Sequence, residues 1–341
     1  MHLQRTKPTY SEISQASGIS VATISRIMNS SKRVSEKARL KIIQALTSLG
    51  YDANTVLPRL SMGGDFILFN IPNIANPFYS LIIQGARDAA KRNGYTLLIN
   101  EDEINEKTIE NFLDMIQKRK PAGIITTNSI SPVILKRLNA LLPVIQCSEY
   151  NENLDIPFIT IDNTSAAKNA VEHLLLLGCK RIAFLNGPLV YKYARNRLAG
   201  YNKALETAGI PIIPELIIQL GDINYDMALS AAYQLLNSEK RPDAFFSSSD
   251  VYAAAVIKAA KKVGLSVPDD LAVVGFDNIE ISSICTPSIT TVSQPRYQMG
   301  LLSCDMLMER ISDRSISIKN IYLDTELIVR ESSSRYYKSR M

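Results

Sequence analysis

The chain has 341 residues, of which 46% are hydrophobic, and this length suggests two or three domains with sizeable cores. Its net charge of +5 is concentrated near the N-terminus: residues 1–60 contain nine Lys or Arg against three Asp or Glu, whereas the remaining 281 residues contain 29 against 30. A basic segment ahead of a neutral body favours a polyanionic partner for that segment, and the alternative is a solvated charged face.

The composition disfavours membrane, exported and metal-dependent proteins. No run reaches about 18 apolar residues and the N-terminus lacks the apolar core of a signal peptide, so we expect no membrane span and a cytoplasmic location. The two histidines do not cluster, and the four cysteines are far apart, which favours reduced core cysteines and no metal or cofactor. The cysteines are Cys147, Cys179, Cys285 and Cys304.

The segment 9–29, TYSEISQASGISVATISRIMN, predicts two short helices joined by a tight turn. Thr9 and Glu12 have the spacing of a capping box. Gly18 suits the left-handed conformation that ends a helix, and Ser20 can cap the next one. Helical spacing places apolar residues on the inner faces of both helices, namely Ile13, Ala16, Ile24, Ile27 and Met28.

The second helix displays small residues and one arginine on its outer face, namely Val21, Ala22, Ser25 and Arg26. Such a surface can enter the major groove of DNA, and the alternative is an ordinary helical hairpin. A third helix is predicted between Ser35 and Gly50, with Ala38, Ile42, Ala45, Leu46 and Leu49 on its buried side. The three helices form a predicted head of residues 1–51, followed by a linker at 52–64 in which Asn54 can cap a short helical turn.

From Asp65 onward, short apolar runs alternate with amphipathic stretches, which predicts an α/β body of two doubly wound lobes with parallel sheets. The expected strands are Phe66–Ile71, Tyr95–Asn100, Ala122–Thr127, Val144–Cys147, Phe158–Ile161, Arg181–Asn186, Leu216–Leu220, Ala244–Ser247 and Leu271–Phe276. The expected helices are Tyr79–Asn93, Glu106–Lys118, Pro132–Leu141, Ala166–Leu177, Arg195–Ala208, Tyr225–Asn237, Val251–Val263 and Tyr297–Ser312.

A boundary near Asp162 divides the predicted body. Residues 65–162 with about 293–322 form the first lobe, and residues 163–292 with about 323–332 form the second. We expect Ile289–Ser293 and Ile321–Val329 to recross and complete the lobes, and residues 333–341 to form a disordered tail.

Polar residues follow several predicted strands, where ligands bind in doubly wound folds. They are Asn76, Asn128, Asp162, Arg197, Asp250, Asp277 and Gln294, a set suited to hydrogen-bonding hydroxyl groups. The alternatives are that Asp162 and Asp250 only cap helices and that Arg197 faces solvent. The sequence contains no GxSxG, HExxH, GxxxxGK[ST] or GxGxxG motif, so no active site is assembled.

The motifs resemble those of the LacI/GalR family of bacterial transcription regulators, from Thr9 to Arg330. They are GISVATISRIMN and VSEKARLKIIQALTSLGY in the head, and NIANPFY, RNRLAGYNKAL, SSDVYAAAVIKAAKKVGLSVPDDLAVVGFDN and SITTVSQPRYQMG in the body. The runs VIQCSEYN, GFDNIE and QPRY resemble the cytidine-repressor branch more than the lactose branch.

The resemblance implies a homodimeric repressor that binds a palindromic DNA operator and holds a sugar or nucleoside effector between its lobes. The implied DNA-binding residues are Thr9, Ser20, Val21, Ala22, Thr23, Ser25, Arg26, Asn29, Asn54 and Leu60. Val21, Ala22 and Arg26 would read bases, while Leu60 would wedge into the minor groove from a hinge helix. We expect the effector to contact Asn76, Phe78, Asn128, Ser148, Tyr191, Arg197, Ile223, Ser249, Asp250, Asp277 and Gln294. The helix Tyr79–Asn93 is expected to contribute to the dimer interface.

Several positions depart from the family pattern. Pro58 lies inside the expected hinge helix, where proline removes a hydrogen bond, and Leu57 stands where alanine is frequent. Ser148, Ile223 and Ser249 replace a frequent Asp, aromatic residue and Asn, which argues against a plain hexose effector. Because the chain has no tryptophan, rings that stack on a ligand must come from Phe or Tyr, such as Phe78, Tyr191 or Tyr193. Two other functions remain open: the solute-binding component of a transporter, or a nucleoside- or sugar-modifying enzyme.

Overall fold

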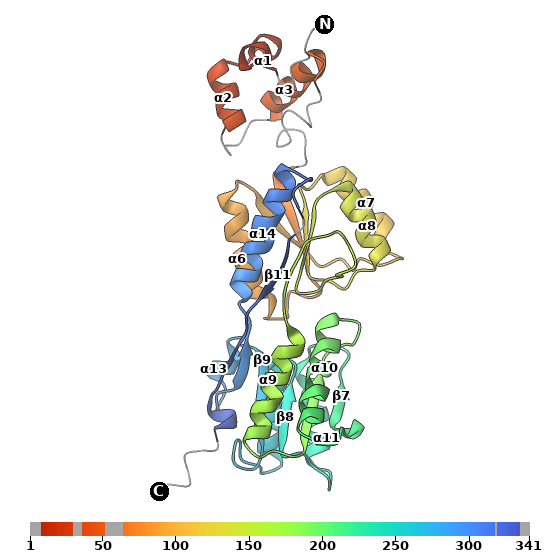
Figure 1. Ribbon diagram of the computed structural model, residues 1–341, viewed down its shortest axis with the longest axis vertical. Coiled ribbons are helices and arrows are strands. Elements are labelled where there is room, and N and C mark those ends of the chain that lie inside the picture. Colours follow the sequence, from red (N-terminus) through yellow and green to blue (C-terminus); the bar gives the residue numbers. More distant parts are fainter. Residues whose placement is uncertain (1–7, 30–35, 52–63, 318, 335–341) are drawn as a thin grey trace.

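The computed structural model describes residues 8–29, 36–51, 64–317 and 319–334 (Figure 1). It contains an N-terminal head of three helices, α1 (Tyr10–Ser17), α2 (Val21–Asn29) and α3 (Glu36–Ser48), followed by two α/β lobes. The predicted linker residues Asn54, Leu57, Pro58 and Leu60 lie outside the described residues. Within the described residues, no helix combines the length and the apolar character that crossing a bilayer requires.

The head is organised by local caps and a small apolar core. The Thr9 side chain accepts a hydrogen bond from the Glu12 amide at 3.3 Å, and the Glu12 carboxylate accepts one from the Thr9 amide at 2.6 Å, which confirms the capping box. Gly18 ends α1 with φ 68°, and Ser20 accepts from the Thr23 amide at 3.3 Å. Ile13, Ile24, Ile42 and Leu46 form the fully buried core between the three helices.

Two predicted core positions of the head are wrong. Ala16 is exposed, and Ser17 is buried instead, because Ser17 lies four residues after Ile13 and therefore shares its face of the helix. Leu49 is 37% exposed because α3 ends at Ser48, and the turn at Gly50 takes the chain off the helical spacing.

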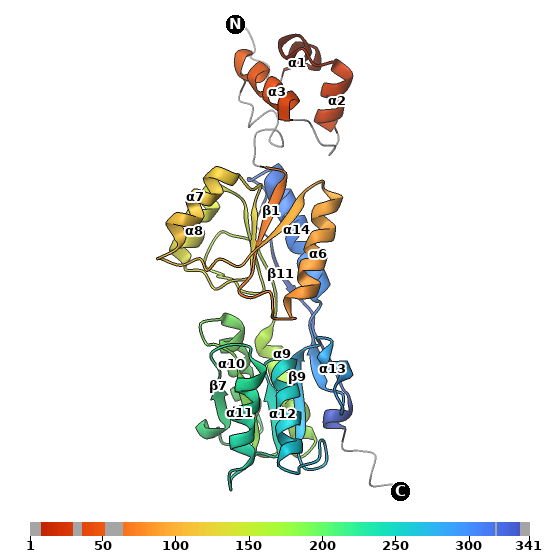
Figure 2. The same ribbon diagram turned by 180° about the vertical axis from the view of Figure 1, so that it is seen from behind.

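The first lobe, or N-lobe, contains a six-stranded parallel sheet in the order β11-β5-β4-β3-β1-β2. Its strands are β1 (Phe66–Asn70), β2 (Thr96–Asn100), β3 (Ile124–Thr126), β4 (Val144–Cys147), β5 (Phe158–Ile161) and β11 (Asn320–Leu323). Helices α6 (Tyr79–Arg92) and α14 (Arg296–Ser312) cover one face, and α7 (Ile109–Arg119) and α8 (Pro132–Leu141) cover the other (Figures 1 and 2).

The second lobe, or C-lobe, repeats this plan with the order β12-β10-β9-β8-β6-β7. Its strands are β6 (Ile182–Asn186), β7 (Ile217–Gln219), β8 (Ala244–Ser247), β9 (Ala272–Asp277), β10 (Thr290–Ser293) and β12 (Glu326–Ile328). Helices α9 (Asn163–Leu176) and α10 (Lys192–Thr207) cover one face, and α11 (Tyr225–Leu236) and α12 (Asp250–Lys262) cover the other. Three short elements complete this lobe: α13 (Ile281–Ile284) and the 3₁₀ turns η1 (Pro214–Leu216) and η2 (Glu331–Ser333).

The chain passes between the lobes three times within residues 64–334. It leaves the N-lobe after β5, returns between β10 and α14, and leaves again between β11 and β12. Both sheets therefore contain strands from two separated parts of the sequence. The carboxyl ends of the central strands of the two lobes face the space between them (Figure 1).

Three further expectations need correction. The strand β12 pairs antiparallel with β10, so the C-lobe sheet is not wholly parallel. Ser333, placed in the disordered tail by the sequence, is fully buried, and its hydroxyl bonds to His173 Nε2 at 2.8 Å. Cys285 is only half-buried, while the other three cysteines are in the core, and none of the four forms a disulfide with another described residue.

Two glycines allow α6 and α14 to approach each other at backbone distance. A Cβ at Gly300 would lie 1.8 Å from the Ile82 carbonyl oxygen, and one at Gly85 would lie 2.0 Å from the Tyr297 carbonyl oxygen. No side chain fits at either position without moving a helix, so this packing depends on glycine.

Candidate functional site

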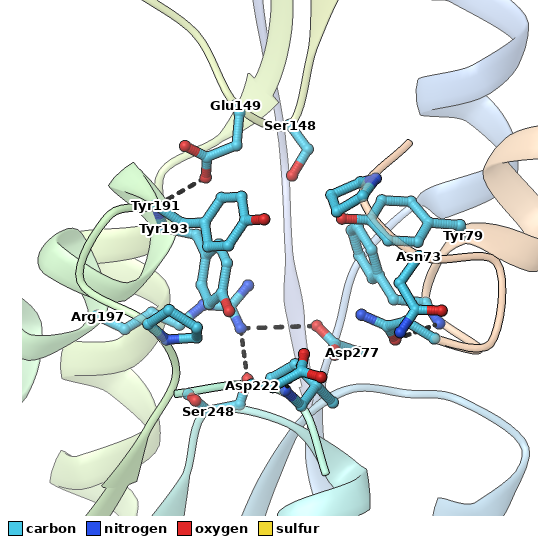
Figure 3. Close-up of a pocket in the computed structure, with 15 residues that line it drawn as sticks. Asn73, Tyr79, Ser148, Glu149, Tyr191, Tyr193, Arg197, Asp222, Ser248 and Asp277 are labelled. Atoms are coloured by element: carbon cyan, nitrogen blue, oxygen red, sulfur yellow. Dashed lines mark hydrogen bonds and ion pairs between the residues drawn. The ribbon is translucent and has the colours of Figure 1, made fainter. Parts of the chain in front are cut away.

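A pocket lies between the lobes, where the loops after several strands converge (Figure 3). The N-lobe contributes the loop between β1 and α6 and the residues after β4; the C-lobe contributes the start of α10 and the ends of β7, β8 and β9. The lining residues are Pro72, Asn73, Asn76, Phe78, Tyr79, Ser148, Glu149, Pro188, Tyr191, Tyr193, Arg197, Asp222, Ile223, Ser248 and Asp277.

Arg197 is buried at the floor of the pocket, with 4% of its surface exposed, so the solvent-facing alternative is wrong. Its Nη1 donates to the Ser248 carbonyl at 2.6 Å, its Nε donates to Asn163 at 2.9 Å, and its guanidinium lies 3.5 Å from the centroid of the Phe276 ring. Burial lowers the pKa of Arg197, and this effect is opposed by nearby acids. The fork is thus held in one orientation by three contacts.

Asp277 stands beside Arg197 at the end of β9, 3.7 Å from its Nη1. Gln294 Nε2 donates to the Asp277 carboxylate at 2.7 Å. The Asp277 backbone has φ 104°, a conformation that residues other than glycine rarely adopt. Burial raises the pKa of Asp277 to about 6, an effect larger than the opposing influence of Arg197 and Arg296. This carboxyl group can therefore both accept and, when protonated, donate hydrogen bonds to hydroxyl groups.

Aromatic rings form two sides of the pocket. Tyr191 and Tyr193 stack with ring centroids 5.6 Å apart and an angle of 22° between their planes. The Arg197 guanidinium lies 4.8 Å from the centroid of Tyr193. From the N-lobe, Phe78 packs edge-on against Tyr79. A flat or ring-shaped ligand can contact these apolar faces while its polar groups reach Arg197 and Asp277.

Seven of the eleven predicted effector residues line this pocket, namely Asn76, Phe78, Ser148, Tyr191, Arg197, Ile223 and Asp277. The other four lie elsewhere. Asn128 donates to Asn70 at 2.6 Å and lines a neighbouring cavity. Gln294 does not line the pocket itself but donates a hydrogen bond to Asp277, which does. Ser249 caps α12 by accepting from the Val251 amide at 3.3 Å.

Asp250 has a buried supporting position. Its carboxylate accepts from the Ile279 amide at 2.8 Å and from the Thr291 hydroxyl at 2.5 Å, and burial raises its pKa well above the ordinary value. It is the first residue of α12 and not the cap, so the capping alternative is wrong for Asp250. The same alternative is confirmed for Asp162, which caps α9 by accepting from the amides of Thr164 and Ser165, both at 3.0 Å.

Several polar lining residues were not predicted from the sequence, among them Asn73, Glu149, Asp222 and Ser248. Glu149 directly follows the predicted residue Ser148 at the end of β4, so the strand-end rule could have identified it. Asp222 lies two residues after the predicted end of a strand at Leu220, and the same signal applies there.

The predicted DNA-binding face of α2 is partly described. Val21 is 46% exposed and Ala22 is exposed, while Thr23 and Ser25 are half-buried. The Ser20 and Thr23 hydroxyls lie 2.8 Å apart. Thr9 is exposed, and the side chains of Arg26 and Asn29 lie outside the described atoms. In the described part of the chain, no group of three or more His, Cys, Asp or Glu could hold a metal ion.

Comparisons with known proteins match both parts of the chain. The family model of bacterial regulatory proteins of the lacI family matches residues 9–54, and that of a periplasmic binding protein-like domain matches residues 171–333. The HTH-type transcriptional repressor CytR of Escherichia coli K12 is 32% identical over 97% of both chains. The ribose operon repressor of Halalkalibacterium halodurans is 33% identical over 95% of this chain and 97% of its own.

A solved structure has a similar fold over most of the chain. The transcriptional regulator CelR in complex with cellobiose superposes with a TM-score of 0.72 at 26% identity, covering 95% of this chain and 99% of its own. These relatives carry the names of regulators and not of enzymes. The chain therefore belongs to the LacI family and is a transcriptional regulator.

Proposed function

We propose that this regulator is a homodimer that represses transcription from a palindromic operator and responds to a small ligand with several hydroxyl groups. The basic head supports operator binding, because its excess of Lys and Arg favours the phosphate backbone and α2 presents small side chains. Two heads on one dimer would read two half-sites related by symmetry.

The effector that suits the pocket best is a nucleoside. The observation that carries this proposal is the buried pair of Arg197 and Asp277 beneath the stacked rings of Tyr191 and Tyr193. A ribose presents neighbouring hydroxyl groups that a carboxylate and a guanidinium can bind together. A base presents a flat face that aromatic rings can cover.

A sugar is the second candidate, because relatives are named for ribose and for a cellobiose complex. Ligand-dependent thermal stabilisation distinguishes the two, since only a ligand that prefers the folded body raises its Tm. We expect nucleosides to raise Tm at concentrations at which free pentoses and hexoses do not. If sugars raise Tm and nucleosides do not, the effector is a sugar and not a nucleoside. If neither class raises Tm, the proposal is wrong.

The proposed dimer and its operator are tested together. Sedimentation at micromolar concentration is expected to give twice the chain mass, and a monomer would contradict the dimer. DNA selected from a random pool by the full chain should contain an inverted repeat. Fluorescence anisotropy at physiological salt should then show tighter binding to the selected DNA than to a scrambled sequence of the same length. Equal binding would contradict sequence-specific recognition.

A further inference from the structure

The first turn of α10 lacks a cap from its own lobe. Tyr191 occupies the N-cap position with the extended backbone typical of a cap, φ −83° and ψ 138°, but its side chain accepts no hydrogen bond there. The first amide groups of a helix have no partner within the helix and must find an acceptor elsewhere. Three other C-lobe helices, α9, α11 and α12, are capped by the residue that directly precedes them.

The acceptor for α10 comes from the opposite lobe. Glu149, which follows β4 of the N-lobe, accepts from the Lys192 amide at 2.7 Å through Oε2. It also accepts from the Tyr193 amide at 3.0 Å through Oε1 (Figure 3). Only 5% of Glu149 is exposed, so both carboxylate oxygens are used away from bulk water. Burial raises the pKa of Glu149, and the hydrogen bonds from the two amides oppose this rise. The partial positive charge at the N-terminus of a helix likewise favours the carboxylate.

Other contacts between the lobes gather on the same short segment. The Ser129 hydroxyl donates to the Val190 carbonyl at 3.1 Å. Lys192 forms an ion pair with Glu152 and places its ammonium group 4.1 Å from the centroid of the Tyr150 ring. Residues 190–193 are therefore held by the N-lobe although they belong to the C-lobe.

This segment leads into the wall of the pocket. Tyr191 and Tyr193 lie on or beside the first turn of α10, and Arg197 lies four residues after Tyr193 on the same helix face. If the lobes separate, the first turn of α10 loses both oxygens of the Glu149 carboxylate as acceptors. This turn orients the tyrosine rings over Arg197, so their positions become less fixed.

We propose that Glu149 is a positioning residue that caps α10 from the opposite lobe, so that separation of the lobes and loosening of the pocket wall at Tyr191 and Tyr193 occur together. Glu149 need not touch the effector for this role. The coupling is a property of the chain without ligand, so its test is independent of the identity of the effector.

Two readouts on the full-length chain test the proposal without ligand. Hydrogen exchange reports protection of the Lys192 and Tyr193 amides. Energy transfer reports the distance between the lobes, measured between dyes on two introduced cysteines. These cysteines replace the exposed residues Leu141 of the N-lobe and Leu176 of the C-lobe. Cys285→Ser removes the half-buried native cysteine, so that the dyes label only the two introduced positions. In Glu149→Ala we expect the two amides to exchange at least about tenfold faster and the dye distances to become longer and more widely distributed. Glu110→Ala, which removes an exposed ion pair to Arg137 within the N-lobe, is the matched control and should change neither readout.

A double variant separates capping from bridging. Tyr191→Asp places an acceptor at the N-cap position within the C-lobe, so Glu149→Ala with Tyr191→Asp should regain protection of the Tyr193 amide while the dye distances stay long. Glu149→Gln retains one acceptor oxygen and should give exchange rates between those of the unaltered chain and Glu149→Ala. This variant replaces Glu149→Ala in the test if the alanine variant fails to fold. Unchanged exchange in Glu149→Ala, unchanged dye distances, or recovery of both readouts in the double variant would each overturn the proposal.

Discussion

The guanidinium of Arg197 and the carboxylate of Asp277 lie 3.7 Å apart at the floor of the interlobe pocket, with at most 5% of either residue exposed. Two ionisable groups in such a place cost the fold stability, because each loses its hydration and the hydrogen bonds to Ser248, Asn163 and Gln294 replace it only in part. The upward shift of the Asp277 pKa and the downward shift of the Arg197 pKa both express this loss. We therefore expect this pair to serve ligand binding more than stability.

The pH dependence of stability should reveal the cost of ionising Asp277. Its pKa in the folded chain is about 6, against an ordinary value of 3.8, so between these pH values the folded state holds the proton more tightly than the unfolded state does. The contribution of Asp277 to stability is therefore greatest below about pH 4 and declines as the pH rises through about 6, by about 2–3 kcal/mol in all.

Asp277→Asn tests this dependence because asparagine does not titrate. Relative to the unaltered chain, Asp277→Asn should become more stable as the pH rises, with its free energy of unfolding increasing by about 2–3 kcal/mol more than that of the unaltered chain between pH 4 and pH 7. Urea unfolding at both pH values measures this change. A constant difference between the two chains across that range would contradict the raised pKa.

Arg197→Lys should abolish stabilisation by the effector while leaving a folded chain. Lysine keeps the charge but cannot reproduce the fork that contacts Ser248 and Asn163, nor the stacking on Phe276. We expect a loss of about 1–3 kcal/mol in unfolding free energy and no ligand-dependent rise in Tm. Arg195→Lys, at an exposed position on the same helix, is the control and should retain that rise. A normal ligand response in Arg197→Lys would exclude direct contact with the effector.

Gly300→Ala should destabilise the N-lobe by at least about 2 kcal/mol, because its methyl group would overlap the Ile82 carbonyl oxygen and force α6 and α14 apart. Gly221→Ala is the matched control, since its Cβ would meet nothing within 4 Å and its φ is not in the left-handed region. Thermal unfolding of both variants measures the difference. Equal Tm values would show that the two helices can separate without loss.

Arg26→Ala should reduce the discrimination between the selected operator and scrambled DNA by about 1–3 kcal/mol, concentrated at one base pair in each half-site. The prediction rests on the position of Arg26 in α2, after the exposed residues Val21 and Ala22. Anisotropy titrations with single-base variants of the operator locate the effect. An equal loss on operator and scrambled DNA would assign Arg26 to phosphate contact instead.

Local patterns were sufficient to predict most of the fold. The spacing of Thr9 and Glu12, the glycine at position 18 and the alternation of apolar runs with amphipathic stretches act over a few residues, and the elements they predict are present. The errors arise where the pattern is short or the partner is distant. Ser17 replaced Ala16 in the core of an eight-residue helix, and β12 acquired its antiparallel direction from pairing with β10.

The pocket was predictable only in part, because a polar residue at the end of a strand has two possible uses. Asp277 lines the pocket. Asp250 is also close to a strand end, but its carboxylate accepts hydrogen bonds from the Ile279 amide and the Thr291 hydroxyl and does not line the pocket. Nothing in the neighbouring sequence separates these two cases. For Glu149, the strand-end rule could have predicted its place at the pocket but not its partners, because the amides at 192 and 193 are more than forty residues away in the other lobe.

The triple passage of the chain between the lobes has a consequence for cutting the molecule. A chain that stopped at Ser312 would lack β11 from the N-lobe sheet and β12 from the C-lobe sheet. A single truncation would therefore leave β5 and β10 as edge strands, one in each lobe and each unpaired on one side. Likewise, hydrolysis of one peptide bond at any single passage would leave the halves tied by the other two. Neither lobe can be released as an intact unit by one break, and nicked protein should keep its hydrodynamic size until denaturant is added.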